Sequence, residues 1–206
     1  MSELLSLFVS HVYRSVLVGK DANALRHELA SACHVLVVDD RAGAQWCRDN
    51  GYNGYTSYAS VSDLPKRMPE FAALARALDK HVARFSDQVG FDLAGGKLKL
   101  DSLWVNVMPN GGTHSGHIHP HSVISGTYYV ALPEGSANLK LEDPRLPMMM
   151  AAPIRRTDAG QSLQPFVTLT PEEGEVILWE SWLRHEVVMN KSTTKRISIS
   201  FNYAWV

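Results

Sequence analysis

The sequence predicts an α+β fold that is mainly β in its second half, with a helical layer over residues 1–95 supporting an antiparallel β-barrel over residues 96–206. Two observations predict it. The segment before Gly95-Gly96 carries helical periodicity, and the segment after it consists of short alternating runs separated by Gly, Pro and Asn. A length of 206 residues suits one domain, 1–206, with a sizeable core.

Two helices are expected in the first half. Asp21 can cap the first of them, in which Leu29 and Cys33 share a face. In the second, over residues 68–91, apolar side chains recur every three to four positions, which is typical of a long amphipathic helix. A short strand within residues 5–18 is the only β element expected before residue 96.

The second half contains many short β-like runs, and their spacing favours a sandwich or barrel over an open sheet. These runs cover residues 97–108, 125–132, 137–142, 166–170, 175–180, 183–189 and 195–205.

Composition excludes several classes of function. The formal net charge is −1, and the Lys and Arg residues are scattered, so the chain lacks the basic patch of a nucleic-acid binder. No apolar run reaches the ~20 residues that span a bilayer, and the first residues lack the layout of a signal peptide. Two cysteines without CxxC spacing favour a reducing, cytoplasmic setting.

Four of the nine histidines lie within eight residues, at positions 114, 117, 119 and 121. On an extended strand, His117 and His119 would share one face with Cα atoms ~7 Å apart, close enough for two imidazoles to bind one metal ion. His185 is the only later histidine and the candidate for a third ligand. The alternative is that these are ordinary loop histidines with no common partner.

The last alternating run, from Arg196 to Tyr203, places apolar and polar side chains on opposite faces. Its polar face could meet solvent, as in a half-buried antiparallel strand. It could instead line a barrel interior, where Arg196 and Ser198 together would bind a carboxylate. The pattern of the strand alone leaves both interpretations open.

The order of these motifs resembles that of the iron(II)/2-oxoglutarate oxygenase superfamily, and most closely a bacterial and phage branch named 2OG-Fe(II) oxygenase. The resemblance covers residues 102–206 with recognisable motifs, and the preceding helices more loosely. The motifs are Trp104-Val-Asn106-Val, His117-Ile-His119-Pro, Ser125-Gly-Thr-Tyr-Tyr129-Val, Pro144-Arg145, Pro171-Glu-Glu-Gly174, His185-Glu-Val and Arg196-Ile-Ser198-Ile-Ser-Phe-Asn202.

The resemblance implies a double-stranded β-helix, a jelly-roll or cupin-like barrel, behind the N-terminal helical layer. It implies that His117 and His185 bind iron(II), with no catalytic residue beyond the metal centre. Arg196 and Ser198 would bind the far carboxylate of 2-oxoglutarate, with help from Tyr129. Asn106 would contact the cosubstrate or the substrate. With O2, the implied reaction oxidises a substrate, most simply by hydroxylation, and releases succinate and CO2.

One position departs from the family. The usual metal site has two histidines and a carboxylate two residues after the first histidine, and here His119 occupies that place. Direct ligation by His119 is the favoured interpretation; the alternative is that His119 lies behind a metal-bound water molecule. Glu142, Asp143 and Glu186 are further carboxylates to consider, although Glu186 should face away from its neighbour His185. The pair His119 and His121 has the same spacing as His117 and His119, so the ligands could instead be assigned two residues later.

Rival functions remain on a similar barrel. A three-histidine zinc hydrolase or lyase needs no carboxylate-binding group, so Arg196 and Ser198 disfavour it. A cupin-type binding protein would need a Glu near Val123 and Ile124, where none stands. A barrel without activity is the third rival. The substrate is expected to be a small molecule or a peptide. The run Met148–Met150 could act as a lid, fill the core or contact a second copy in a homodimer.

Overall fold

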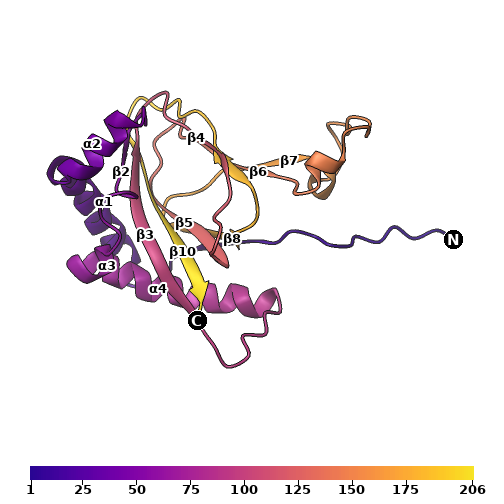
Figure 1. The fold of residues 1–206 in the computed structure, drawn as a ribbon, viewed down its shortest axis with the longest axis horizontal. Coiled ribbons are helices and arrows are strands. Elements are labelled where there is room, and N and C mark those ends of the chain that lie inside the picture. The colour runs from indigo at the N-terminus through magenta and orange to yellow at the C-terminus, as the bar shows by residue number, and fades with distance from the viewer.

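Helices and strands follow the predicted division of the chain. The computed structural model describes all of residues 1–206 (Figure 1). The first half contains β1 (Val12–Val16), α1 (Ala22–Asp39), α2 (Arg41–Asp49), β2 (Tyr55–Thr56), α3 (Leu64–Arg67) and α4 (Pro69–Gln88). The second half contains β3 (Leu98–Met108), β4 (His114–His117), β5 (Ile124–Ala131), β6 (Leu139–Glu142), β7 (Phe166–Leu169), β8 (Glu175–Glu180), β9 (His185–Val187) and β10 (Arg196–Trp205).

The strands form two sheets whose pairs are all antiparallel. The larger has six strands in the order β1-β8-β5-β10-β3-β2, and the smaller has four in the order β4-β9-β6-β7. Figure 1 shows the four helices against one face of the larger sheet, with the smaller sheet on its other side. The predicted mixture of helices with antiparallel strands is confirmed.

The main core lies between the helices and the larger sheet. A cluster of 25 buried apolar residues joins α1 and α4 to β3, β5, β8 and β10. On α4, Phe71, Leu74, Leu78, Val82 and Phe85 are all buried, as their helical spacing predicted. A second cluster of 6 buried residues, which includes Tyr129 and Trp179, fills the space on the opposite face of the larger sheet.

The last strand carries its polar face into the protein. Ile197, Ile199, Phe201 and Tyr203 belong to the main core. On the opposite face of β10, Arg196, Ser198 and Asn202 are also buried. The solvent interpretation of this face is therefore wrong, because the smaller sheet covers it.

Three local expectations need correction. Asp21 precedes α1 as expected, but its side chain makes no capping hydrogen bond. The strand expected within residues 5–18 is present as β1 and pairs with β8, but β2 is a second strand before residue 96, so the expectation of a single β element there is wrong. His119 does not lie on a strand, since β4 ends at His117.

The run Met148–Met150 does not fill the core. It lies in the connection between β6 and β7, which Figure 1 shows projecting away from the sheets. Met148 is 75% exposed and Met150 is 92% exposed. None of the helices combines the length and the apolar character that crossing a bilayer would require.

Candidate metal centre

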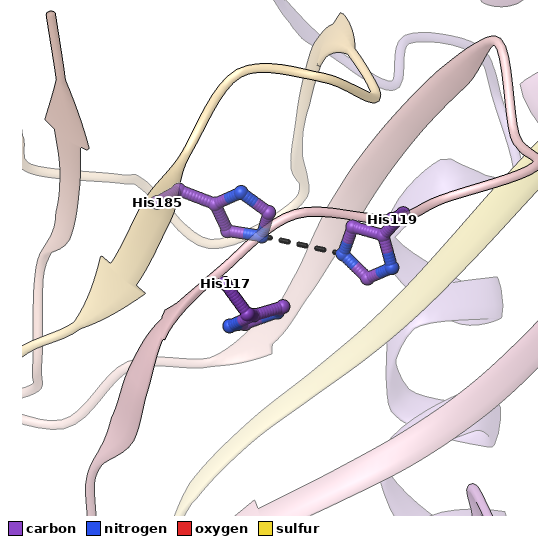
Figure 2. Close-up of side chains that lie close together, drawn as sticks. All are labelled: His117, His119 and His185. Atoms are coloured by element: carbon purple, nitrogen blue, oxygen red, sulfur yellow. Dashed lines mark hydrogen bonds between the residues drawn. The ribbon is translucent and has the colours of Figure 1, made fainter. Parts of the chain in front are cut away.

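Three histidines from distant parts of the sequence meet at one point. His117, His119 and His185 each offer a ring nitrogen, and these atoms lie within 4.8 Å of one another. Figure 2 shows the three rings turned towards a common centre. The geometric expectation drawn from the sequence, that the pair and its distant partner converge, agrees with this arrangement.

Strand pairing explains the position of two of the rings. His117 on β4 lies directly opposite His185 on β9, and the ring centroids are 4.4 Å apart. His119 enters from the coil after β4, and its Nε2 lies 3.3 Å from Nε2 of His185 (Figure 2). The cluster therefore combines a cross-strand pair with one ring from a loop.

Backbone carbonyls orient the two paired rings. Nδ1 of His117 lies 2.7 Å from the carbonyl oxygen of Ser115, and Nδ1 of His185 lies 2.9 Å from that of Leu183. A carbonyl can only accept, so each Nδ1 carries the proton and donates it. Each Nε2 is left with a free lone pair, which is the form that binds a metal ion.

The environment keeps two of the imidazoles neutral. Burial, followed by the neighbouring His117, lowers the pKa of His185 to about 3 and that of His119 to about 4. Neither ring needs to lose a proton at neutral pH before it binds a metal ion.

No carboxylate joins the cluster. The three candidates from the sequence each pair with a basic side chain: Glu142 with Arg184 at 3.1 Å, Asp143 with Arg145 at 2.8 Å, and Glu186 with Lys140 at 2.8 Å. The group of potential ligands contains only the three histidines. His121 is exposed at a positive φ of 72° in the loop and is not part of it.

A buried guanidinium lies on the facing sheet. Arg196 is 1% exposed, and it donates from Nε to the Ala137 carbonyl at 3.2 Å and from Nη1 to Ser198 Oγ at 2.9 Å. Its Nη2 makes no hydrogen bond within the protein, and no carboxylate pairs with the group. The ring of Tyr129 lies 5.3 Å from the guanidinium carbon, and burial raises the pKa of this phenol to about 12.

Asn106 lies opposite Ser198 in the β3–β10 ladder. Its Nδ2 donates to Ser200 Oγ at 3.1 Å, while its Oδ1 is buried without a hydrogen-bond partner. Unpaired buried polar atoms are rare in folded proteins and often mark places where a ligand or water molecule binds.

Two residues of this region were missed by the sequence analysis. His114, at the start of β4, forms a short hydrogen bond with the hydroxyl of Tyr52. Burial, followed by the charge of Arg196, lowers the pKa of His114 to about 4. The dense histidine stretch was the signal for His114. No sequence signal pointed to Tyr52, because it lies in a turn-rich loop 62 positions away from its partner His114.

Tryptophans border the histidines. The ring of Trp104 lies 5.8 Å from that of His119, and the ring of Trp179 lies 4.6 Å from that of His185. Trp179 belongs to the second buried cluster, and it also packs on His185. Trp182 and Trp205 are about half exposed.

The candidate residues are divided between the two sheets. The smaller sheet and its loop carry the three histidines, whereas β3, β5 and β10 of the larger sheet carry Asn106, Tyr129 and the Arg196–Ser198 pair. The space between the sheets is therefore bordered by nitrogen donors on one side and by a buried cation on the other.

Comparisons with known proteins identify a family and several structures of similar fold. Residues 102–202 match the model of the family described as "Putative 2OG-Fe(II) oxygenase". No curated protein matches the sequence. Among solved structures, AviO1 from Streptomyces viridochromogenes Tue57 is similar with 16% identity and a TM-score of 0.63, over 95% of this chain and 90% of that chain.

Two further structures have comparable similarity. A Pseudomonas putida prolyl-4-hydroxylase has 14% identity and a TM-score of 0.57, over 95% of this chain and 93% of that chain. HygX from Streptomyces hygroscopicus, solved with nickel and 2-oxoglutarate bound, has 15% identity and a TM-score of 0.58, over 95% of this chain and 83% of that chain.

Through residues 102–202 the chain belongs to the 2OG-Fe(II) oxygenase family, whose members are oxidoreductases that depend on iron and 2-oxoglutarate. The family predicted from the sequence motifs is thereby confirmed. The residues present also suit such a metal: His117, His119 and His185 could hold the ion, because imidazole is a good ligand for iron. The unpaired guanidinium and the unpaired Asn106 oxygen suit an additional polar ligand.

Proposed function

We propose that this protein is an iron(II)/2-oxoglutarate-dependent dioxygenase that oxidises, most simply hydroxylates, a small-molecule or peptide substrate and releases succinate and CO2. The observation that carries the proposal is Arg196, a fully buried cation without an anionic partner, on the sheet that faces three convergent histidines.

An unpaired buried charge is costly. Removal of an ion from water costs several kcal/mol even after relaxation of the protein, unless an opposite charge compensates it. Burial lowers the pKa of Arg196, which expresses the same cost. Two neutral acceptors, Ala137 O and Ser198 Oγ, satisfy only part of its five N–H donors. A bound carboxylate would complete the set, and the planar guanidinium is suited to it.

The neighbours of Arg196 support a carboxylate as the ligand. Ser198 and Tyr129 each have a hydroxyl that can donate to it. A 180° rotation of the Asn106 amide would let Ser200 donate to its oxygen and would direct the freed Nδ2 towards the ligand. The four residues that the family resemblance nominated for 2-oxoglutarate thus have compatible hydrogen-bonding capacity.

The metal centre would be held by Nε2 of His117 and His185, which the Ser115 and Leu183 carbonyls orient, and by His119. When bound, iron(II) would activate O2, and oxidative decarboxylation of 2-oxoglutarate to succinate and CO2 would provide two of the four electrons that reduce O2, the substrate providing the other two as it is oxidised. The protein's own residues bind and orient. Three neutral imidazoles leave the charge of the ion uncompensated, and this favours an anionic cosubstrate.

We also propose that the larger and the smaller sheet are the two halves of a double-stranded β-helix. Support comes from the family match and from structural neighbours that align over nearly the whole chain. For the cellular setting we propose the reducing cytoplasm, and the two free, buried cysteines Cys33 and Cys47 support it.

The test is a spectroscopic titration. Metal-free protein receives Fe(II) under anaerobic conditions and is then titrated with 2-oxoglutarate, while the visible metal-to-ligand charge-transfer band is recorded. The wild type should develop the band, and H117A and H185A should not. R196K and S198A should bind Fe(II) as the wild type does but need more 2-oxoglutarate. S86A, which changes a buried serine on α4, is the control that should leave both constants unchanged.

Two results would contradict the proposal. One is the absence of the band together with tightly retained zinc, which would favour the three-histidine zinc hydrolase or lyase. The other is an unchanged 2-oxoglutarate affinity in R196K and S198A, which would remove the carboxylate assignment. Because lysine keeps the charge but loses the planar fork, R196K tests geometry without leaving an empty site.

A further inference from the structure

His119 is the one member of the three-histidine cluster whose position no strand pairing determines. His117 and His185 lie opposite each other in the β4–β9 ladder, whereas His119 follows after β4 has ended. Figure 2 shows its ring carried by coil and directed towards His185. Contacts other than the ladder must hold this ring in the cluster.

Backbone hydrogen bonds fasten residues 118–123, the histidine loop, to the turn after β8. The His119 amide donates to the Ser181 carbonyl at 3.0 Å, and the Ser181 amide donates to the Val123 carbonyl at 3.0 Å. The Val123 amide donates to the Tyr203 carbonyl on β10 at 2.8 Å. Ser181 therefore contacts both ends of the histidine loop, and its position decides where His119 lies.

A chain of side-chain hydrogen bonds runs from Ser181 across the larger sheet. Ser125 Oγ lies 2.7 Å from Ser181 Oγ and donates to Asn202 Oδ1 at 2.8 Å. Asn202 Nδ2 donates to Ser102 Oγ at 3.2 Å. A hydroxyl has one proton, and that of Ser125 is directed to Asn202, so Ser181 is the donor to Ser125. The chain has one direction, from the end of β8 through β5 and β10 to β3.

The location of this chain is informative. Ser125, Ser181 and Asn202 are buried where apolar side chains could fill the same volume. A fully satisfied polar network makes a core rigid and selects one arrangement of the groups that it joins. The neighbouring pair Thr127 and Ser200 is also hydrogen-bonded, but no hydrogen bond joins these two side chains to the histidine loop. The hydrogen-bond chain that begins at Ser181 is joined to this loop, because the Ser181 backbone bonds to His119 and Val123.

We propose that Ser125 and Asn202 are positioning residues that act through Ser181 to hold His119 in the metal centre. Strand pairing fixes the positions of His117 and His185. The position of His119 is fixed instead by side-chain hydrogen bonds that connect Ser181 to three strands of the larger sheet. The inference rests on the metal site of the proposed function and not on its 2-oxoglutarate chemistry.

A double-mutant cycle on metal affinity tests the proposal. Chelator-treated protein is titrated with Co(II), and the visible d–d bands report both the affinity and the ligand geometry. S125A should weaken Co(II) binding about tenfold, the lower end of what loss of a group that supports a metal ligand costs. In an H119A background, S125A should change the affinity less than about twofold, because the ligand that it positions is gone.

Equal weakening by S125A in both backgrounds would show a general structural role and overturn the proposal, as would an unchanged affinity in both. S86A, which removes a buried serine hydroxyl on α4, is the matched control and should leave the Co(II) bands unchanged. If S125A does not fold, S102A removes only the last link, on a partly exposed residue. It should give a smaller loss that again depends on His119.

The failure of this inference and that of the proposed function are distinguishable. An absent charge-transfer band with Fe(II) and 2-oxoglutarate would reject the oxygenase proposal, while the Co(II) cycle would still report on the position of His119. Conversely, a normal charge-transfer band together with a zero coupling in the Co(II) cycle would reject only the role of Ser125 and Asn202.

Discussion

His185 and His119 are 66 positions apart in the chain, yet their Nε2 atoms lie 3.3 Å apart. Two neutral imidazoles at this distance can share one hydrogen bond, and a metal ion can replace that bond with two stronger ones. The pair therefore places a histidine where the family usually has a carboxylate, and it makes the ligand role of His119 directly testable.

Replacement of His119 should weaken metal binding more than replacement of any residue that merely supports a ligand. Loss of a supporting hydrogen bond costs roughly 10–100-fold in metal affinity, so H119A should exceed this range in a Co(II) or Zn(II) titration. H121A is the matched control, because His121 is exposed and outside the cluster. Equal effects of the two variants would contradict ligation by His119.

The acidic residues near the site should be dispensable for metal binding. Glu186 pairs with Lys140 at 2.8 Å and Glu142 pairs with Arg184 at 3.1 Å, and neither belongs to the cluster. E186Q and E142Q should therefore leave the metal content after dialysis unchanged. Both ion pairs are partly exposed to solvent, and ion pairs in contact with solvent contribute little to stability, so the melting temperature should hardly move. Metal loss in E186Q would contradict this prediction and would indicate a centre of two histidines and one carboxylate.

The metal-free protein should lose stability as the pH falls below about 6.5. His185 has a pKa of about 3 in the fold against 6.5 for an ordinary histidine, so between these values the unfolded state binds more protons. The free energy of unfolding then rises with pH, by at most about 1.4 kcal/mol per pH unit for each such group. Urea denaturation of chelator-treated protein across this range measures the slope.

A variant identifies the source of that slope. In H185Q the side chain no longer titrates, and the pH dependence should become shallower than in the wild type. An identical slope in wild type and variant would assign the acid sensitivity to other groups, such as His114, whose pKa burial lowers to about 4.

Much of the fold could be predicted because periodicity encodes it. Phe71 to Phe85 repeat at helical spacing and all face the core, and the alternation from Arg196 to Tyr203 separates two buried faces. What the pattern of β10 could not decide was the burial of its polar face, since this depends on the smaller sheet that covers it. The chain holds no local signal for that packing.

The candidate site likewise has features that the sequence predicts and features that depend on tertiary structure. His117 and His185 could be paired from motif order alone, while the place of His119 in a loop and the contact of His114 with Tyr52 depend on tertiary structure. A spacing of two residues predicted a shared strand face. The rings converge instead because hydrogen bonds to Ser181 fold the loop back after β4. Long-range backbone contacts of this kind leave no trace in a short motif.

Gly126 should not tolerate a larger side chain. A Cβ at this position would lie 2.5 Å from Leu178 Cδ2 and 2.6 Å from Phe201 Cζ, and both side chains are buried in the main core. G126A should therefore lower the free energy of unfolding by about 1–3 kcal/mol, measured by urea denaturation.

Gly160 provides the comparison. A Cβ there would meet nothing within 4 Å, and its φ of −52° suits any residue. G160A should be neutral or slightly stabilising. If G126A were as stable as G160A, the packing between β5, β8 and β10 would have to be looser than the contacts indicate.

The division of the site between two sheets has a mechanical consequence. A molecule bound to the metal centre at one end and to Arg196 at the other would connect the two sheets. The local stability of the smaller sheet should increase most on binding. This is because β4 and β9 share only two paired positions, whereas β10 pairs along its length with β3. In the empty protein the four-stranded layer should therefore exchange its amide protons first, and occupancy should slow that exchange without altering the six-stranded layer.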